Sequence, residues 1–241
     1  SGTICGLVGE NGAGKSTTIR LLMGALRPDS GTCSALGVDT SSPEFLAIKE
    51  DVGVVLDEAY FPEVLNADQV GRVMTRTYQR WDAKVYAAYL RRFDLPLKKA
   101  FKDFSRGMRM KLSIAVALSH SPKLLVLDEA TAMLDPQGRR EVLETVRWLN
   151  REKGITIVMI THHMDEAAQA DRVVVMEDGH VIDDGPPRKI FAQVDKMHQT
   201  GLGVPQTVEV LEELNRKGCS LPIDALTVEE CAQRLMAFLE D

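Results

Sequence analysis

The stretch GENGAGKST, residues 9 to 17, restricts the folds open to this chain more than any other feature. It fits the pattern G-x-x-x-x-G-K-[ST], follows the apolar run TICGLVG and precedes the helical run KSTTIRLLMGAL. Glycines at such a turn let backbone N–H groups converge on phosphate oxygens, and the helix adds the positive end of its dipole. A glycine-rich turn with a chance Lys-Ser pair is the alternative. The motif predicts a nucleoside triphosphate site made of Gly9, Asn11, Gly12, Gly14, Lys15, Ser16 and Thr17.

Apolar runs and helical runs alternate along the chain. DVGVVLD, KLLVLDE and GITIVMIT are apolar without polar alternation, which is typical of parallel strands covered on both faces. Between Asn66 and Ser119 no strand is evident, and three helical runs interrupt the pattern. Asp178-Gly179, between two apolar runs, predicts a hairpin turn. We therefore expect an α/β fold with a mainly parallel core sheet and an inserted helical subdomain.

The domain organisation follows from the same pattern. Residues 1–185 are predicted to form one domain, with the helical subdomain at about 60–120, and residues 186–241 a short C-terminal helical appendage. In the last helix, Thr227 and Glu230 have capping-box spacing. Helical spacing places Val228, Cys231, Leu235 and Leu239 on one face, which we expect to pack on another element.

Composition excludes several classes of function. The net charge of −6 gives a long anionic partner no electrostatic attraction, so no nucleic-acid partner is expected. No apolar run approaches the ~18 residues that a membrane span needs. The four cysteines have no metal-ligand spacing, which favours reduced thiols in a reducing compartment.

Two adjacent carboxylates end the apolar run LLVLDE. Asp128 is placed to hold Mg²⁺ together with the Ser16 hydroxyl, while Lys15 supplies a charge to the β and γ phosphates. Glu129 follows directly, as a base that polarises the attacking water. A nucleotide kinase also has a phosphate loop, but it has no reason to follow the metal-binding Asp with Glu. The pair predicts an ATPase in which Glu129 is catalytic.

The segment DFSRGMRMKLSIAVALSHSPKLLVLDEATAMLDP, followed by ITIVMITHHMDEA, resembles the ATP-binding cassette (ABC) ATPases. That family carries a signature loop, commonly LSGGQ, before the strand that ends in the metal-binding Asp. The resemblance implies that Ser105, Arg106 and Gly107, with Arg106 in place of a glycine, meet the γ-phosphate held by a second cassette. It also implies that Asp135 reaches across the dimer and that His162 contacts the γ-phosphate. His163 is expected to begin the following helix.

Two departures from the family pattern affect the expectations. Asp57 stands where the family usually has Gln, and it is a weak candidate for holding Mg²⁺ through water. The chain begins only a few residues before the phosphate loop, without the aromatic residue that stacks on adenine in the family. We therefore expect an N-terminally incomplete cassette.

The resemblance differs between the two halves of the chain. Up to about residue 130, runs such as VGVVLDEAYFPEVL and RWDAKVYAAYLRRFDLPLKK resemble the drug- and antibiotic-export branch. From about residue 131 to 241, runs such as TAMLDPQGRREVL and GLGVPQTVEVLEELNRKG resemble energy-coupling factor (ECF) ATPases of vitamin and metal-ion uptake. The family implies an ATP-hydrolysing transport subunit on the cytoplasmic face of the membrane, with separate transmembrane permease subunits and a second ABC ATPase as partners. Export is weighted slightly above ECF-type import. A soluble ABC ATPase acting on DNA or the ribosome, and a nucleotide-binding regulator with weak hydrolysis, are the further alternatives.

Overall fold

A computed structural model describes residues 2–56, 61–132 and 134–240. Contacts divide the chain into two compact units. The first unit is Ser1–Thr3 with Ser16–Met159, and the second unit is Ile4–Lys15 with Ile160–Asp241.

The first unit has three strands of the main sheet in the order β4-β5-β6, with helices around them. Its strands are β2 (Ser34–Ala35), β3 (Val38–Asp39), β4 (Val52–Val55), β5 (Leu124–Asp128) and β6 (Thr156–Ile160), the last of which ends at the unit boundary. Its helices are α1 (Lys15–Leu22), which begins at the boundary, α2 (Phe45–Ile48), η1 (Lys49–Asp51), α3 (Ala67–Thr77), α4 (Ala83–Arg92), η2 (Phe101–Asp103), α5 (Arg106–Leu118) and α6 (Pro136–Lys153). Strands β4 and β5 pair in parallel, from Val52 opposite Leu124 to Val55 opposite Leu127. The consecutive buried side chains in the middle of β5 agree with a strand covered on both faces.

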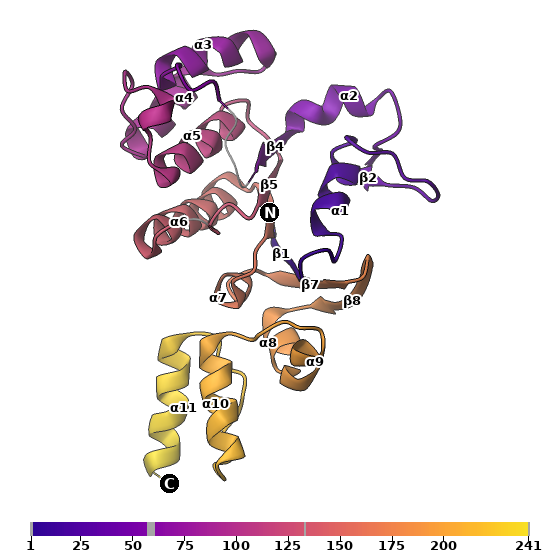
Figure 1. The fold of residues 1–241 in the computed structure, drawn as a ribbon, viewed down its shortest axis with the longest axis vertical. Coiled ribbons are helices and arrows are strands. Elements are labelled where there is room, and N and C mark those ends of the chain that lie inside the picture. The colour runs from indigo at the N-terminus through magenta and orange to yellow at the C-terminus, as the bar shows by residue number, and fades with distance from the viewer. Residues whose placement is uncertain (1, 57–60, 133, 241) are drawn as a thin grey trace. The chain divides into compact units, whose positions relative to one another are not determined.

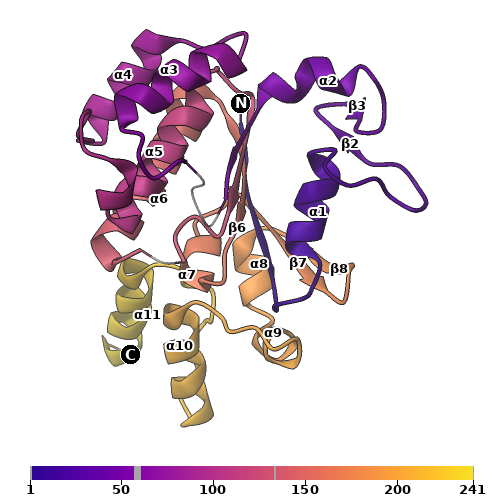
Figure 2. The ribbon, with the colours of Figure 1, turned by 45° about the horizontal axis from the view of Figure 1, so that its top comes forward.

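The helices predicted between Asn66 and Ser119 are present as α3, α4 and α5, which lie together in both views (Figures 1 and 2). Asn66 and Gln69 form a reciprocal capping box at the start of α3, and the Asp82 carboxylate caps α4. Helix α5 also packs on β4 and on α6, so it links the helical insertion to the strands of this unit. The domain boundaries at about 60–120 and at 185 stay predictions.

The second unit has the strand order β1-β7-β8. Its strands are β1 (Ile4–Gly9), β7 (Arg172–Glu177) and β8 (His180–Gly185), and its helices are α7 (Met164–Ala167), α8 (Pro187–Phe191), α9 (Val194–Gln199), α10 (Gln206–Arg216) and α11 (Val228–Glu240). Strands β1 and β7 are parallel, and β7 and β8 are antiparallel. The turn between β7 and β8 has Asp178 at φ 46° and Gly179 at φ 78°, which confirms the predicted hairpin. The α/β class with mostly parallel strands is confirmed.

The C-terminal helices are held to the strands of this unit by an apolar core. Val8 of β1 and Val173 of β7 are buried in one cluster with Phe191 of α8 and Met197 of α9. A smaller cluster joins α10 to α11 through Leu211 and Cys231, and these two helices lie side by side (Figure 1).

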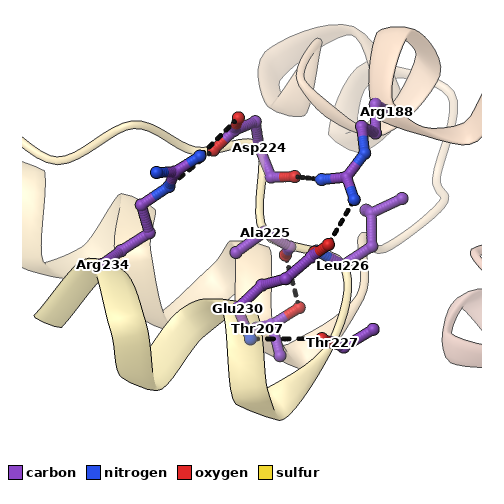
Figure 3. A network of polar contacts seen from close by, with 8 residues as sticks. All are labelled: Arg188, Thr207, Asp224, Ala225, Leu226, Thr227, Glu230 and Arg234. Carbon is purple, nitrogen blue, oxygen red and sulfur yellow. Dashed lines mark hydrogen bonds and ion pairs between the residues drawn. The ribbon is translucent and has the colours of Figure 1, made fainter.

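Polar contacts fix the start of α11 (Figure 3). Arg188 of α8 donates a hydrogen bond to the carbonyl of Asp224 (2.6 Å) and pairs with the carboxylate of Glu230. Arg234 donates two hydrogen bonds, of 3.2 and 3.1 Å, to the Asp224 carboxylate. These contacts tie α8, α11 and the turn before α11 together.

The predicted capping box of α11 forms only in part. The Thr227 hydroxyl accepts a hydrogen bond from the Glu230 amide (3.2 Å), but the Glu230 carboxylate accepts from the amide of Leu226 (2.9 Å). The apolar face of α11 is also covered only in part, because Val228 and Leu239 are 72% and 82% exposed. Across the described residues, no helix combines the length and the apolar character needed to cross a bilayer.

Candidate functional site

The predicted phosphate loop connects β1, which ends at Gly9, to α1, which begins at Lys15. Gly12 and Gly14 have φ values of 91° and 96°, a backbone region that favours glycine strongly. The amide of Ala13 donates to the carbonyl of Glu10 (3.1 Å), which closes the turn. Glycine therefore stands at two positions of the loop where another residue would be strained.

The three glycines of the loop serve different purposes. A Cβ atom on Gly9 would lie 2.4 Å from the carbonyl oxygen of Met176 on the neighbouring strand, so this glycine is required by the sheet. A Cβ atom on Gly12 would have no heavy atom within 4 Å. A Cβ atom on Gly14 would touch Gly179 at 3.4 Å. Access of a ligand was the predicted reason for all three glycines, but at Gly9 the close approach of the neighbouring strand requires glycine.

Lys15 is held beneath the loop. Its ammonium group donates hydrogen bonds to the carbonyl oxygens of Gly9 (2.8 Å) and Glu10 (2.9 Å), and the residue is only 5% exposed. A buried cation is stable only when hydrogen-bonded or paired, and these carbonyl groups meet that requirement. A fixed positive charge beneath a loop of glycines fits a polyphosphate group.

A hollow of about 400 Å³ in the second unit brings several predicted residues together. Gly9, Asn11 and His162 line it. Gly201 and Gly203, from the connection between α9 and α10, line it as well, and sequence reasoning missed both. The pair of glycines in GLGVPQ was the only available signal. His163 precedes α7 as expected, and its amide donates to the Thr161 hydroxyl (3.0 Å).

Asp128 and Glu129 lie at the end of β5 in the first unit, and both are half-buried. Glu129 has a φ of 49°, in the left-handed region. Such backbone strain costs on the order of 1–3 kcal/mol in a residue other than glycine, and it concentrates at functional sites. Ser16 and Thr17 belong to the same unit, in the first turn of α1. The Ser16 hydroxyl and the Asp128 carboxylate are oxygen donors of the kind that Mg²⁺ takes, and Asp57 lies outside the described residues.

The signature residues lie at the start of α5. Ser105 is the N-cap, and its hydroxyl accepts a hydrogen bond from the Met108 amide (3.3 Å). Arg106, the first residue of the helix, is exposed, and Gly107 is half-buried. A Cβ atom on Gly107 would lie 3.9 Å from Leu134, so a small side chain would fit the space around it.

Asp135 caps α6 in the same way, with its carboxylate accepting from the Gly138 amide at 2.6 Å. A second hollow, of about 430 Å³ and within the first unit, is lined by Ser105, Arg106, Gly107 and Asp135. Two helix N-termini therefore meet at one hollow, where their dipoles favour an anion. The family resemblance implied separate roles for the signature residues 105–107 and for Asp135, and in the structure all of them line one hollow.

An ion pair joins the two helices beside this second hollow. Lys111 of α5 contacts the carboxylate of Glu141 of α6, which also accepts a hydrogen bond from the side chain of Gln137 (3.2 Å). The contact with Lys111, followed by that with Gln137, lowers the pKa of Glu141. The pair therefore joins the second turns of α5 and α6.

The chain is similar to known proteins both in sequence and in fold. A family model described as ABC transporter matches residues 1–132. The energy-coupling factor transporter ATP-binding protein EcfA1 of Clostridium perfringens is 37% identical over 244 residues, which cover 95% of this chain and 84% of that protein. The structure of cbiO1 from C. perfringens, described as part of the ABC transporter complex cbiONQ, superposes with a TM-score of 0.69 at 29% identity and covers 87% of each chain. The ATP-binding cassette MJ0796, dimeric and bound to ADP and Pi, matches in fold, with a TM-score of 0.68 at 23% identity, over 77% of this chain and 85% of that one.

The predicted division of the chain near residue 130 is not supported. The EcfA1 relatives match across 95% or more of the chain, including the part assigned to the drug-export branch. The export resemblance is carried by the runs VGVVLDEAYFPEVL and RWDAKVYAAYLRRFDLPLKK, which lie within the part that the EcfA1 relatives match. These runs therefore do not separate one branch from the other.

The family model and the relatives that match across 95% of the chain show the family to which it belongs. The chain belongs to the ABC transporter family of ATP-binding proteins, as an ATP-hydrolysing transporter subunit.

Proposed function

We propose that this ATPase subunit powers an ECF-type uptake transporter for vitamins or metal ions. The observation that carries the proposal is the likeness to EcfA1, which continues through the C-terminal helices as well as the nucleotide-binding part. Residues 186–241 then form the appendage of a domain that ends at about residue 185.

The phosphate loop would bind the nucleotide through its backbone N–H groups and Lys15. Because the Lys15 ammonium is already hydrogen-bonded to Gly9 and Glu10, its position is set before ligand arrives. Asn11 of the loop is a further proposed phosphate contact, and Thr17, in the first turn of α1, is another. Mg²⁺ would be held by Ser16 and Asp128, with Asp57 as a weaker candidate, and it would neutralise phosphate charge.

Glu129 is the proposed proton acceptor for the attacking water. The left-handed backbone of Glu129, directly after the proposed Mg²⁺ ligand Asp128, supports this role, because such strain concentrates at functional sites. His162 is the proposed γ-phosphate contact, and its position in the same hollow as Gly9 and Asn11 supports this role.

The second hollow is the proposed contact with another ABC ATPase. Ser105, Arg106 and Gly107 begin one helix there, and Asp135 caps another. Two helix N-termini and an exposed guanidinium suit the phosphates of a nucleotide held by the partner. Both a homodimer and a heterodimer meet this requirement.

The proposed location is the cytoplasmic face of the membrane, with separate transmembrane permease subunits carrying the transport path. The negative net charge of the chain gives a nucleic-acid partner no support.

The direction of transport tests the proposal. The chain would be reconstituted in vesicles with an ECF transmembrane component and a substrate-binding subunit, with ATP enclosed inside. An uptake system moves substrate toward the side that holds the ATPase, so labelled vitamin or metal ion should accumulate inside. A complex that carries Glu129→Gln is the matched control and should accumulate none.

Movement of the substrate away from the ATP side would contradict uptake. Failure of the chain to associate with the ECF membrane component, while it associates with an export permease, would also contradict the proposal.

A further inference from the structure

The connection between α9 and α10, residues 200–205, runs beside the phosphate loop. Gly201, Leu202 and Gly203 line the same hollow as Asn11 and His162. All of these residues belong to the second unit, and the three residues of the connection come from the proposed appendage.

Apolar contacts hold this connection in place. Leu202 and Val204 are buried in one cluster with Val8 and Met164. Val8 immediately precedes Gly9, and Met164 follows the two histidines. The connection is therefore packed against residues that flank the phosphate loop on one side and His162 on the other.

A backbone contact adds to this anchoring. The amide of Gln206, the first residue of α10, donates a hydrogen bond to the carboxylate of Asp165 in α7 (3.2 Å). The start of α10 is thus tied to the short helix that follows His162 and His163.

Gly201 lies directly against Glu10 of the phosphate loop. A Cβ atom on Gly201 would be 1.7 Å from Oε1 and 2.4 Å from Cδ of Glu10, and Gly201 has a φ of 68°. The backbone carbonyl of Glu10 accepts the hydrogen bond from Lys15 (2.9 Å). One chain of contacts therefore runs from Gly201 through Glu10 to the Lys15 ammonium.

We propose that the segment from Gly201 to Gly203 forms a wall of the phosphate site, and that Gly201 is a positioning residue that sets the place of the Glu10 side chain. This inference rests on the proposed nucleotide site. Glu10 is exposed and already lines the hollow, and a side chain at position 201 must displace its carboxylate. We expect the displaced charge to repel the phosphates of the nucleotide. The appendage thereby acts on nucleotide binding within its own chain.

Hydrogen–deuterium exchange of the full wild-type chain tests the wall, with and without Mg-ATP. Nucleotide should slow exchange in peptides covering residues 8–16 and also in peptides covering 199–204. Peptides covering 216–220, outside the hollow, serve as the control and should not change. Protection of 8–16 without protection of 199–204 would overturn the inference. No protection of 8–16 would instead contradict the nucleotide site itself.

Gly201→Ala tests the positioning role through the dissociation constant for Mg-ATP. We expect affinity to fall about ten-fold, a change that equilibrium titration resolves readily. Gly218→Ala is the matched control, because Gly218 also has a positive φ (102°) but a Cβ atom there would have no heavy atom within 4 Å. This control introduces backbone strain without touching the phosphate loop, and it should bind ATP as the wild type does.

A double substitution separates repulsion by Glu10 from general damage. Glu10→Ala combined with Gly201→Ala should bind Mg-ATP as tightly as Glu10→Ala alone, because the displaced carboxylate is gone. Equal affinities for Gly201→Ala and wild type would overturn the positioning role. So would a double variant as weak as Gly201→Ala, and thermal unfolding of every variant confirms that each is folded.

Discussion

The ammonium group of Lys15 lies 2.8 Å from the carbonyl oxygen of Gly9, the last residue of the strand that leads into the phosphate loop. Lys15, at the end of the phosphate loop, is thus hydrogen-bonded to Gly9, at the start of the same loop. Its charge is held at the place where the loop glycines leave backbone exposed, and no rearrangement of its long side chain is needed for phosphate to bind.

Replacement of this lysine should remove most of the affinity for ATP. Lys15→Met loses a charge-assisted hydrogen bond to phosphate worth about 1.5–3 kcal/mol, which corresponds to roughly ten- to hundred-fold weaker binding. Lys217→Met is the matched control, since Lys217 is exposed and pairs only with Glu213 at 3.2 Å among the contacts described. Calorimetric titration with ATP gives both affinities. An unchanged affinity in Lys15→Met would exclude Lys15 from the phosphate site.

Asp135 caps helix α6 and is also the proposed contact across the dimer, and substitutions can separate these two roles. Asp135→Ala removes the acceptor for the Gly138 amide and should lower the free energy of unfolding by about 0.5–2 kcal/mol. Asp135→Asn keeps an acceptor and should keep the stability. Asp82→Ala, which removes the cap of α4, is the control with a comparable loss of stability.

Urea unfolding and ATP hydrolysis are then compared across these three variants. Both Asp135 variants should hydrolyse ATP more slowly, whereas Asp82→Ala should keep its rate at temperatures where it is folded. A wild-type rate in Asp135→Asn would contradict the proposed contact across the dimer.

The contact between Arg188 and Glu230 predicts a dependence of stability on pH. The hydrogen bond from Arg188 lowers the pKa of the Glu230 carboxyl group from its ordinary value of 4.5 to about 2 in the folded chain. The stabilisation is therefore fully present above pH 4.5 and is lost as the pH falls toward 2. Glu230 is 34% exposed, so solvent screens the pair and the effect is modest.

Glu230→Gln tests this dependence in thermal unfolding at a series of pH values. The wild type should be more stable than the variant at neutral pH, and the difference should shrink as the pH falls below 4.5. A difference that stays constant down to pH 2 would show that the carboxylate charge does not hold α11 in place.

The left-handed backbone at Glu129 predicts an unusual order of stabilities. Glu129→Gly and Glu129→Ala remove the same functional group, but only glycine relieves the strain at φ 49°. The glycine variant should be the more stable of the two by roughly 1 kcal/mol, as measured by denaturant unfolding. An alanine variant of equal or greater stability would mean that the backbone relaxes without cost.

Local patterns in the sequence predicted much of the fold and part of the site. The phosphate loop, the position of Asp128 at the end of a strand and the Asp178-Gly179 hairpin depend on turn chemistry and on short apolar runs. Such features are encoded within a few neighbouring residues, so a single sequence is enough to find them.

Contacts between distant parts of the chain could not be predicted in this way. Nothing near Glu10 indicates that Gly201 lies against it, because the contact depends on how the C-terminal helices pack. The requirement for glycine at position 9 likewise depends on a distant residue, Met176 of the neighbouring strand. The partly exposed face of α11 shows the same limit, since helical spacing predicts an apolar face but not what covers it.

Single-turnover hydrolysis of Mg-ATP by the wild-type chain and by Glu129→Gln, at matched occupancy by ATP, tests the account most directly. The variant should bind ATP as the wild type does and release phosphate about 10²–10⁴-fold more slowly, which is the usual effect of losing a general base. Equal rates in the two proteins would remove Glu129 from catalysis and contradict the account.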